Sequence, residues 1–217
     1  MSQEKRVFAP NGWAMLAANI ALFVGAIVLT VIFVATIDTR LWVGLQIFWF
    51  LAAVFTWALA VTTCFGYFTL QPNEGRVLIL FGAYRGTVRD AGWRWTNPLN
   101  TKVRISLRSR NLNGDRLKVN DKRGNPIEIA VVVVWRVEDT AQASFDVDDY
   151  EEYVEVQSES AVRHLANCYA YDHGEDDEIT LRSSVEEVSD ALHAELQERV
   201  AKAGVAIEEA RITHLAY

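Results

Sequence analysis

Two long apolar segments dominate the first third of the chain. Residues 12–37 and residues 41–66 each run for 26 positions without a charged side chain, and only Asp38, Thr39 and Arg40 separate them. A helix of about 20 apolar residues crosses the hydrocarbon core of a bilayer, so each segment predicts a membrane-spanning helix. The short connection predicts that the two helices form an antiparallel hairpin.

Two other interpretations of these segments fit less well. A helix buried in a soluble core normally carries a polar stripe, whereas Asn19 and Gln46 are the strongly polar side chains of these segments. A cleaved signal peptide has an apolar region of about 7–15 residues and is not followed by a second span. We therefore expect residues 1–12 to form a tail, residues 13–66 a two-span anchor, and residues 67–217 a folded domain.

Basic residues flank the predicted hairpin unevenly. Lys5 and Arg6 precede it, Arg40 in its turn is balanced by Asp38, and four arginines follow it at positions 76, 85, 89 and 94. The positive-inside rule then predicts a cytoplasmic (inner or plasma) membrane protein with both termini in the cytoplasm. The two cysteines of the chain form no visible disulfide framework, which agrees with that location.

The pattern after the spans predicts an α+β domain. Residues 76–82 and 102–108 alternate with the period of two that marks strands, and residues 82–98 indicate turns around a short strand. Residues 116–121 and 126–139 predict a hairpin. Its second strand contains the uninterrupted valine run 131–134, which we expect to be covered on both faces.

Two helices and a last strand are predicted to follow. Residues 146–169 begin with acidic side chains suited to a helix N-terminus, and residues 183–204 show apolar positions every three or four residues. Ser183 with Glu186 and Ser184 with Glu187 have the spacing of a capping box, and Gly204 is expected to end the helix. Residues 205–217 are then expected to enter the sheet, which gives a mostly antiparallel sheet with packed helices.

Charge is segregated along this domain. Residues 74–124 hold 12 Lys and Arg against 4 Asp and Glu, and residues 126–217 hold 6 against 22. A basic segment next to a bilayer attracts anionic headgroups, so we expect Arg85, Arg89, Arg94 and Trp93 to contact the membrane surface. The alternative is that both segments are ordinary solvated faces. Nucleic-acid binding is disfavoured, because these basic residues alternate on strands beside a membrane anchor.

No catalytic constellation, cofactor site or metal site is predicted. The four histidines accompany no zinc, serine-hydrolase or phosphate-loop motif. The acidic cluster 172–178 is the one metal candidate, and it lacks the alternation of an EF-hand loop. A membrane-tethered hydrolase or metal-dependent enzyme remains the alternative, using Ser158, Ser160, His164 and the residues through 178. A monomeric module that binds anionic lipid is a third possibility.

Several of these motifs together resemble the SPFH family, also called Band 7 or the prohibitin-homology domain, whose members include stomatins, prohibitins and flotillins. The similar stretches are QPNEGRVLILFGAYRGTVRDAGWRWTNP, LKVNDKRGNPIEIAVVVVWRV, DDYEEYV and ARITHLAY. The resemblance covers about residues 67–217, and the hairpin is similar to one bacterial subgroup. It implies a non-enzymatic, membrane-anchored scaffold that self-assembles, often as rings. Such a scaffold organises lipid microdomains or regulates membrane proteins such as AAA-type proteases.

The mode of assembly is left open by the sequence. Related chains typically continue past the equivalent of Tyr217 into a long helical region used in assembly, so the chain is either a shortened form or a short member. Within the domain, a basic edge is expected to meet an acidic edge of the next subunit in a homo-oligomer. We expect Glu151, Glu152 and Glu155 to lie on that acidic edge. Which membrane protein or lipid is organised, and the oligomer size, do not follow from the sequence.

Overall fold

The computed structural model describes residues 2–37, 42–172 and 179–217. The chain divides into two compact units. One consists of Arg6–Arg104, and the other consists of Ile105–Tyr217 together with the N-terminal residues through Lys5. The predicted hairpin turn, Asp38 to Arg40, lies outside the described residues.

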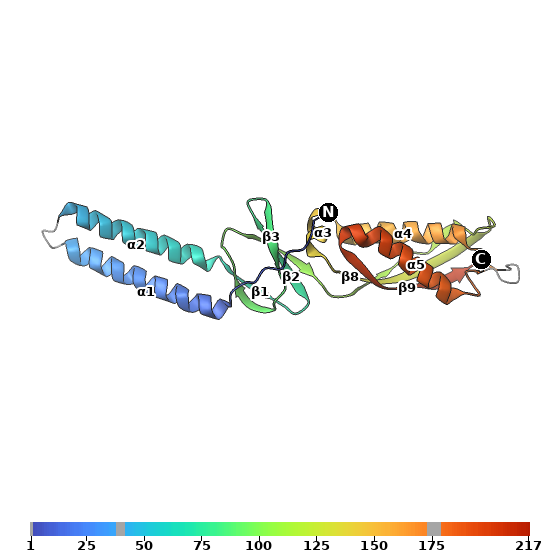
Figure 1. Cartoon of the computed structure of the whole chain (residues 1–217), viewed down its shortest axis with the longest axis horizontal. Helices are drawn as coiled ribbons and strands as arrows, with labels where there is room; N and C mark the ends of the chain where they lie inside the picture. Colours follow the sequence, from blue (N-terminus) through green and yellow to red (C-terminus); the bar gives the residue numbers. More distant parts are fainter. Residues whose placement is uncertain (1, 38–41, 173–178) are drawn as a thin grey trace. The chain divides into compact units, whose positions relative to one another are not determined.

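Two long helices form the predicted hairpin in the first unit (Figure 1). Helix α1 spans Gly12–Ile37 and helix α2 spans Val43–Cys64, and both are long and apolar enough to cross a membrane. Polar side chains pair between them in antiparallel order. Thr63 Oγ1 donates to Asn19 Oδ1 at 3.3 Å, Trp57 Nε1 to Thr30 Oγ1 at 3.2 Å, and Gln46 Nε2 to the Thr36 carbonyl at 2.9 Å. Lipid chains offer no hydrogen-bond partners, so polar side chains in candidate spans need partners on the neighbouring helix, and this pairing supplies them.

Short strands follow the hairpin in the same unit. Strand β1, Tyr67–Leu70, pairs antiparallel with β4, Gly92–Trp95. Strand β2, Glu74–Leu80, pairs antiparallel with β3, Ala83–Val88, and has β5, Thr101–Ser106, on its other edge. A small apolar core is shared by these strands and the segment before α1, and it consists of Ala9, Phe68, Leu70, Leu78 and Val88.

The second unit is built on one long strand. Strand β8, Pro126–Val137, pairs antiparallel along one edge with β9, Val205–Ala216. Its other edge is shared by β6, Arg110–Asn113, and β7, Leu117–Asn120. The β7–β8 hairpin and the final strand confirm the sequence predictions. Strands β1, β4 and β6 were not predicted as separate strands.

Helices pack on this sheet as the α+β prediction requires. Helix α4, Tyr150–Cys168, packs against β7, β8 and α5, and α5, Val185–Val200, packs against β9 (Figure 1). A short helix α3, Thr140–Phe145, follows β8, and a 3₁₀ turn η1, Ala201–Ala203, follows α5. The expectation that β8 is covered on both faces is wrong. Val131 and Val133 are buried, whereas Val132 and Val134 are half-buried, so the helices seal one face.

Two of the predicted helix ends are confirmed and one is not. Asp149 caps α4 by accepting hydrogen bonds from the amides of Glu151 at 2.8 Å and Glu152 at 3.3 Å. Gly204 follows η1 with a left-handed φ of 65°, a conformation that strains residues other than glycine. The predicted capping box does not form. Ser184 makes no side-chain cap, and Ser183 Oγ lies 2.6 Å from Thr180 Oγ1 instead.

Candidate membrane junction and assembly surfaces

Trp95 of β4 connects the soluble strands to the end of α2. Its indole Nε1 donates a hydrogen bond of 2.9 Å to the carbonyl of Thr63, in the last turn of the helix. The Thr96 amide donates to the Gly66 carbonyl at 3.0 Å. The last carbonyls of a helix have no partner within it, so these groups need donors from outside. Trp95 supplies one of those donors and thereby fixes β4 against the helix end.

Lys102 of β5 contributes a second donor at the same helix end. Its Nζ donates to the Phe65 carbonyl at 2.6 Å and lies 6.0 Å from the centre of the Phe68 ring. A cation at this position complements the negative end of the helix dipole. Burial, and to a smaller extent repulsion by Arg76, lowers the pKa of Lys102 below its ordinary value.

Trp93 of β4 packs against the start of α1. Its ring lies 5.0 Å from the Trp13 ring in an edge-to-face arrangement and stacks on Tyr67 at 5.0 Å. A Cβ added at Gly12 would lie within 3.0 Å of the Trp93 ring, so the close approach of helix and ring requires glycine. Successive tryptophans of one strand therefore contact the two ends of the hairpin. Trp93, predicted to touch the membrane surface, is half-buried in this cluster.

The segment before α1 runs along the same strands. The Val7 amide donates to the Thr87 carbonyl and the Trp95 amide to the Pro10 carbonyl, both at 3.0 Å, and Asn11 forms a bridge with Arg94. Arg94 Nη1 also donates to the Ala9 carbonyl at 3.2 Å. The chain that enters the hairpin and the chain that leaves it are thus hydrogen-bonded to one strand, β4.

The three arginines predicted at the membrane surface differ in their surroundings. Arg85 of β3 is exposed, near the β2–β3 turn where Phe81 is 86% exposed. Arg89 is half-buried. Arg94 is half-buried and holds the segment before α1 through Ala9, with its guanidinium carbon 5.9 Å from the Phe8 ring. Arg85 is therefore the most available of the three for a contact outside the chain.

The three glutamates predicted at an assembly edge lie near the start of α4, and all are exposed. Glu151 forms an ion pair with Arg110 of the same chain. That guanidinium lies 5.5 Å from the Trp135 ring and 5.8 Å from the Tyr150 ring. Burial raises the pKa of Tyr150, so its hydroxyl stays protonated beside this pair. Glu152 and Glu155 form no ion pair with other described residues, which leaves their charges available.

The described residues of the enzyme alternative do not assemble into one site. Ser158 is buried, whereas His164 is exposed and its Nδ1 contacts Glu195 Oε1 at 3.0 Å. The Ser160 hydroxyl accepts a hydrogen bond of 3.1 Å from Arg199. Cys168 lies 3.8 Å from His164 Nε2 at the exposed end of α4, a pair that the sequence analysis did not single out. The remaining candidates, His173 and Asp176, lie outside the described residues.

Within residues 2–37, 42–172 and 179–217, no three His, Cys, Asp or Glu side chains are placed to hold one ion. Most of the predicted metal candidate, residues 173–178, lies outside those ranges.

The family model of the SPFH domain / Band 7 family matches residues 68–217. The chain belongs to the SPFH domain / Band 7 family. A comparison with curated proteins found no match. The match begins one residue after β1 starts, so the SPFH domain begins within four residues of Cys64, the last residue of α2.

Sequence reasoning missed the residues that join the SPFH domain to the hairpin. Trp95, Gly66 and Lys102 were not singled out, although their contacts fix β4 and β5 to the end of α2. The available signal was the pair of tryptophans at positions 93 and 95. On one strand their spacing of two places both indoles on one face, next to helix ends rich in aromatic residues.

Proposed function

We propose that this SPFH protein is a non-enzymatic, membrane-anchored scaffold. In this proposal it self-assembles and organises a membrane microdomain or regulates membrane proteins such as AAA-type proteases. The observation that carries the proposal is the junction of Trp93 and Trp95 with the two ends of the hairpin. First strands fixed to both ends of the anchor present the same surface to the bilayer in every copy, which an ordered assembly requires.

In the proposed topology, residues 13–66 are the anchor, residues 67–217 are the SPFH domain, and both termini are cytoplasmic. Pairing of the segment before α1 with β3 and β4 supports placing both hairpin ends on one side of the membrane. The arginines that follow the hairpin support the cytoplasmic side by the positive-inside rule.

For assembly we propose a heterologous contact in a homo-oligomer, closing into a ring, with Glu152 and Glu155 on the acidic side. Such contacts place different faces of neighbouring subunits together. Charge sets register and orientation in a contact of this kind more than affinity, and exposed charges are screened beyond about 8 Å at physiological salt. Glu151 is expected to contribute less than the other two, because Arg110 already neutralises it.

The test is cross-linking of the full 217-residue protein in native membranes, combined with the mass of the detergent-extracted particle. We expect a ladder of oligomers that shrinks at high salt and in the Glu152→Lys, Glu155→Lys double variant. The matched control is Glu186→Lys, Glu187→Lys, which reverses two charges in the first turn of α5. A lone monomer band under every condition contradicts the scaffold.

A monomeric module that binds anionic lipid is the second candidate. Exposed Phe81 at the β2–β3 turn, together with exposed Arg85, favours it, since an aromatic and a basic side chain suit a headgroup region. The same particle mass distinguishes the candidates, because this module predicts one copy of the chain per particle.

A further inference from the structure

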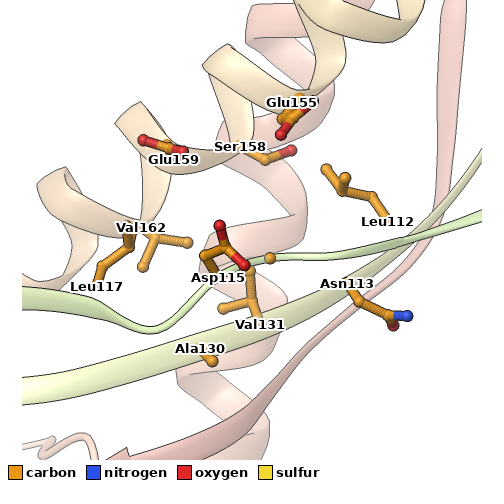
Figure 2. A pocket seen from close by; sticks show the side chains of 11 residues that line it. Leu112, Asn113, Asp115, Leu117, Ala130, Val131, Glu155, Ser158, Glu159 and Val162 are labelled. Atoms are coloured by element: carbon orange, nitrogen blue, oxygen red, sulfur yellow. The ribbon is translucent and has the colours of Figure 1, made fainter.

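A small pocket lies between α4 and the connection from β6 to β7 (Figure 2). Its volume is about 60 Å³, compared with about 10–15 Å³ needed to hold one water molecule by the same kind of measure. The inner walls are apolar and consist of Leu112, Leu117, Ala130, Val131 and Val162. The pocket therefore has room for a short alkyl group and a small polar head.

One buried hydroxyl in this pocket lacks a hydrogen-bond partner. Ser158 of α4 is 2% exposed, lines the pocket, and its Oγ has no partner among the described residues. A buried polar group without a partner is destabilising, so such groups in folded proteins normally meet a water, an ion or a ligand. The hydroxyl is therefore available to accept a hydrogen bond from a group inside the pocket.

Carboxylates from both walls also line the pocket. Figure 2 shows the Asp115 side chain directed from the β6–β7 connection toward α4, which contributes Glu155 and Glu159. Glu159 has a long ion pair of 3.9 Å with Arg163. Asp115 and Glu155 have no ion pair with any described residue. The lining thus combines uncompensated negative charge with an apolar interior.

We propose that this pocket binds a primary ammonium group carried on a short alkyl chain. An ammonium has three donors and no acceptor, which matches a lining whose free groups are carboxylates and a hydroxyl. The alkyl stem would replace water against the apolar walls, as Lys stems do on protein surfaces. The same chemistry occurs in a free polyamine and in a lysine side chain of a peptide. This site goes beyond the scaffold function. It shares Glu155 with the proposed assembly contact, but its test is read at a thiol inside the pocket and is separate from the cross-linking test.

The test uses a thiol placed inside the pocket. Ser158→Cys is introduced into the full-length protein with Cys64→Ala and Cys168→Ser, and the thiol is modified by methanethiosulfonates of similar size but opposite charge. The thiolate attacks the reagent sulfur, a mixed disulfide forms and methanesulfinate leaves. At position 158, the rate of modification by the cationic aminoethyl reagent is divided by the rate for the anionic sulfonatoethyl reagent. The same ratio is measured at Cys168 in a Cys64→Ala protein, and the two ratios are compared.

We expect the ratio at position 158 to exceed the ratio at Cys168 by about tenfold or more, because two unpaired carboxylates attract the cation and repel the anion. Glu155→Gln and Asp115→Asn are each expected to lower the ratio severalfold. Glu187→Gln, which removes an exposed charge from α5 outside the pocket, is the matched control and is expected to leave the ratio unchanged. Equal ratios at positions 158 and 168, or equal effects of Glu187→Gln and Glu155→Gln, overturn the proposal.

A protection experiment then distinguishes the two sources of the ligand. Putrescine and spermidine represent free polyamines, and an acetylated, amidated Gly-Lys-Gly peptide represents a lysine side chain. In each arm, the rate at which a neutral methyl methanethiosulfonate modifies the thiol introduced at position 158 is measured with and without the ligand. Slower modification in either arm supports the site, and the ligand that slows it identifies the source. The uncharged norleucine peptide and sodium chloride at equal ionic strength are the controls. Protection by neither arm, or equal protection by a control, shows that the pocket holds water only and overturns the proposal.

Discussion

Replacing Gly66 by Ala tests whether the hairpin and the first strands of the SPFH domain are fixed to each other. An added Cβ would lie within 3.0 Å of both Trp95 Nε1 and the Thr96 carbonyl oxygen. The second neighbour is backbone, so it moves only if β4 moves. We therefore expect Gly66→Ala to separate β4 from the end of α2 rather than to be absorbed by a side-chain rotation.

The size of the effect follows from the contacts at this position. Moving β4 breaks the hydrogen bond from Trp95 to Thr63 and the one from Thr96 to Gly66, each worth about 1 kcal/mol net. Overpacking of a close contact adds about 1–3 kcal/mol. The expected loss in the free energy of unfolding is about 3–5 kcal/mol, or a fall in the melting temperature of about 6–20 °C for a chain of this size.

The assay is thermal unfolding of the full-length protein in nanodiscs, followed by near-ultraviolet circular dichroism, which reports on the environments of the seven tryptophans, Trp95 among them. Gly25→Ala is the matched control, since an added Cβ at this α1 position has no neighbour within 4 Å. We expect Gly25→Ala to behave as wild type. Equal melting temperatures for the two variants would refute the interlocked junction.

Three further predictions concern single positions. Arg85→Gln is expected to lower the hydrogen-exchange protection of the β2–β3 hairpin about fivefold in anionic nanodiscs, since a basic residue at a membrane surface contributes about 1 kcal/mol. No effect is expected in zwitterionic nanodiscs. The control is Arg116→Gln, because Arg116 is also exposed. Burial opposes ionisation of Asp121, but hydrogen bonds from Asn125, Tyr171 and Arg123 outweigh it and lower its pKa. The stabilisation that ionised Asp121 provides is therefore complete above the unfolded pKa of about 3.9 and is lost as pH falls through the lower folded pKa. Asp121→Asn should lower the free energy of unfolding at pH 7 by about 1–3 kcal/mol and make it depend less on pH in the acid range. Cys168 is exposed, so an impermeant thiol reagent should label it in inverted membrane vesicles without unfolding. Labelling in intact cells would contradict the proposed cytoplasmic topology.

Long, strongly patterned segments of this chain could be predicted from sequence. The spans follow from 26 uncharged positions each, and α4 follows from the acids at its start, where Asp149 accepts the free amides. Strand β9 follows from the stop at Gly204. These features depend on local rules, in which a residue and its neighbours within one turn or one strand decide the outcome.

Short elements and non-local contacts could not be predicted in the same way. Strands β1 and β4 have four residues each, too few for an alternation to stand out beside a span or a glycine-rich stretch. The partner of Trp95 is 32 positions away, so that contact is decided by how folded segments meet. The capping box at Ser183 does not form because its hydroxyl pairs with the hydroxyl of Thr180 instead, and the Ser183 amide donates to the same Thr180 oxygen at 3.1 Å.

The junction also constrains how the chain enters the membrane. The segment before α1 is synthesised first, yet its partners Thr87 and Arg94 follow both spans in sequence. Those pairs form only if α2 returns the chain to the side from which α1 departed. A chain inserted with a single span would leave the Thr63 carbonyl without its indole donor and the β4 edge without Pro10. In the proposed two-span topology, the hydrogen bonds of the soluble strands therefore add to the stabilisation that the apolar length of the helices provides.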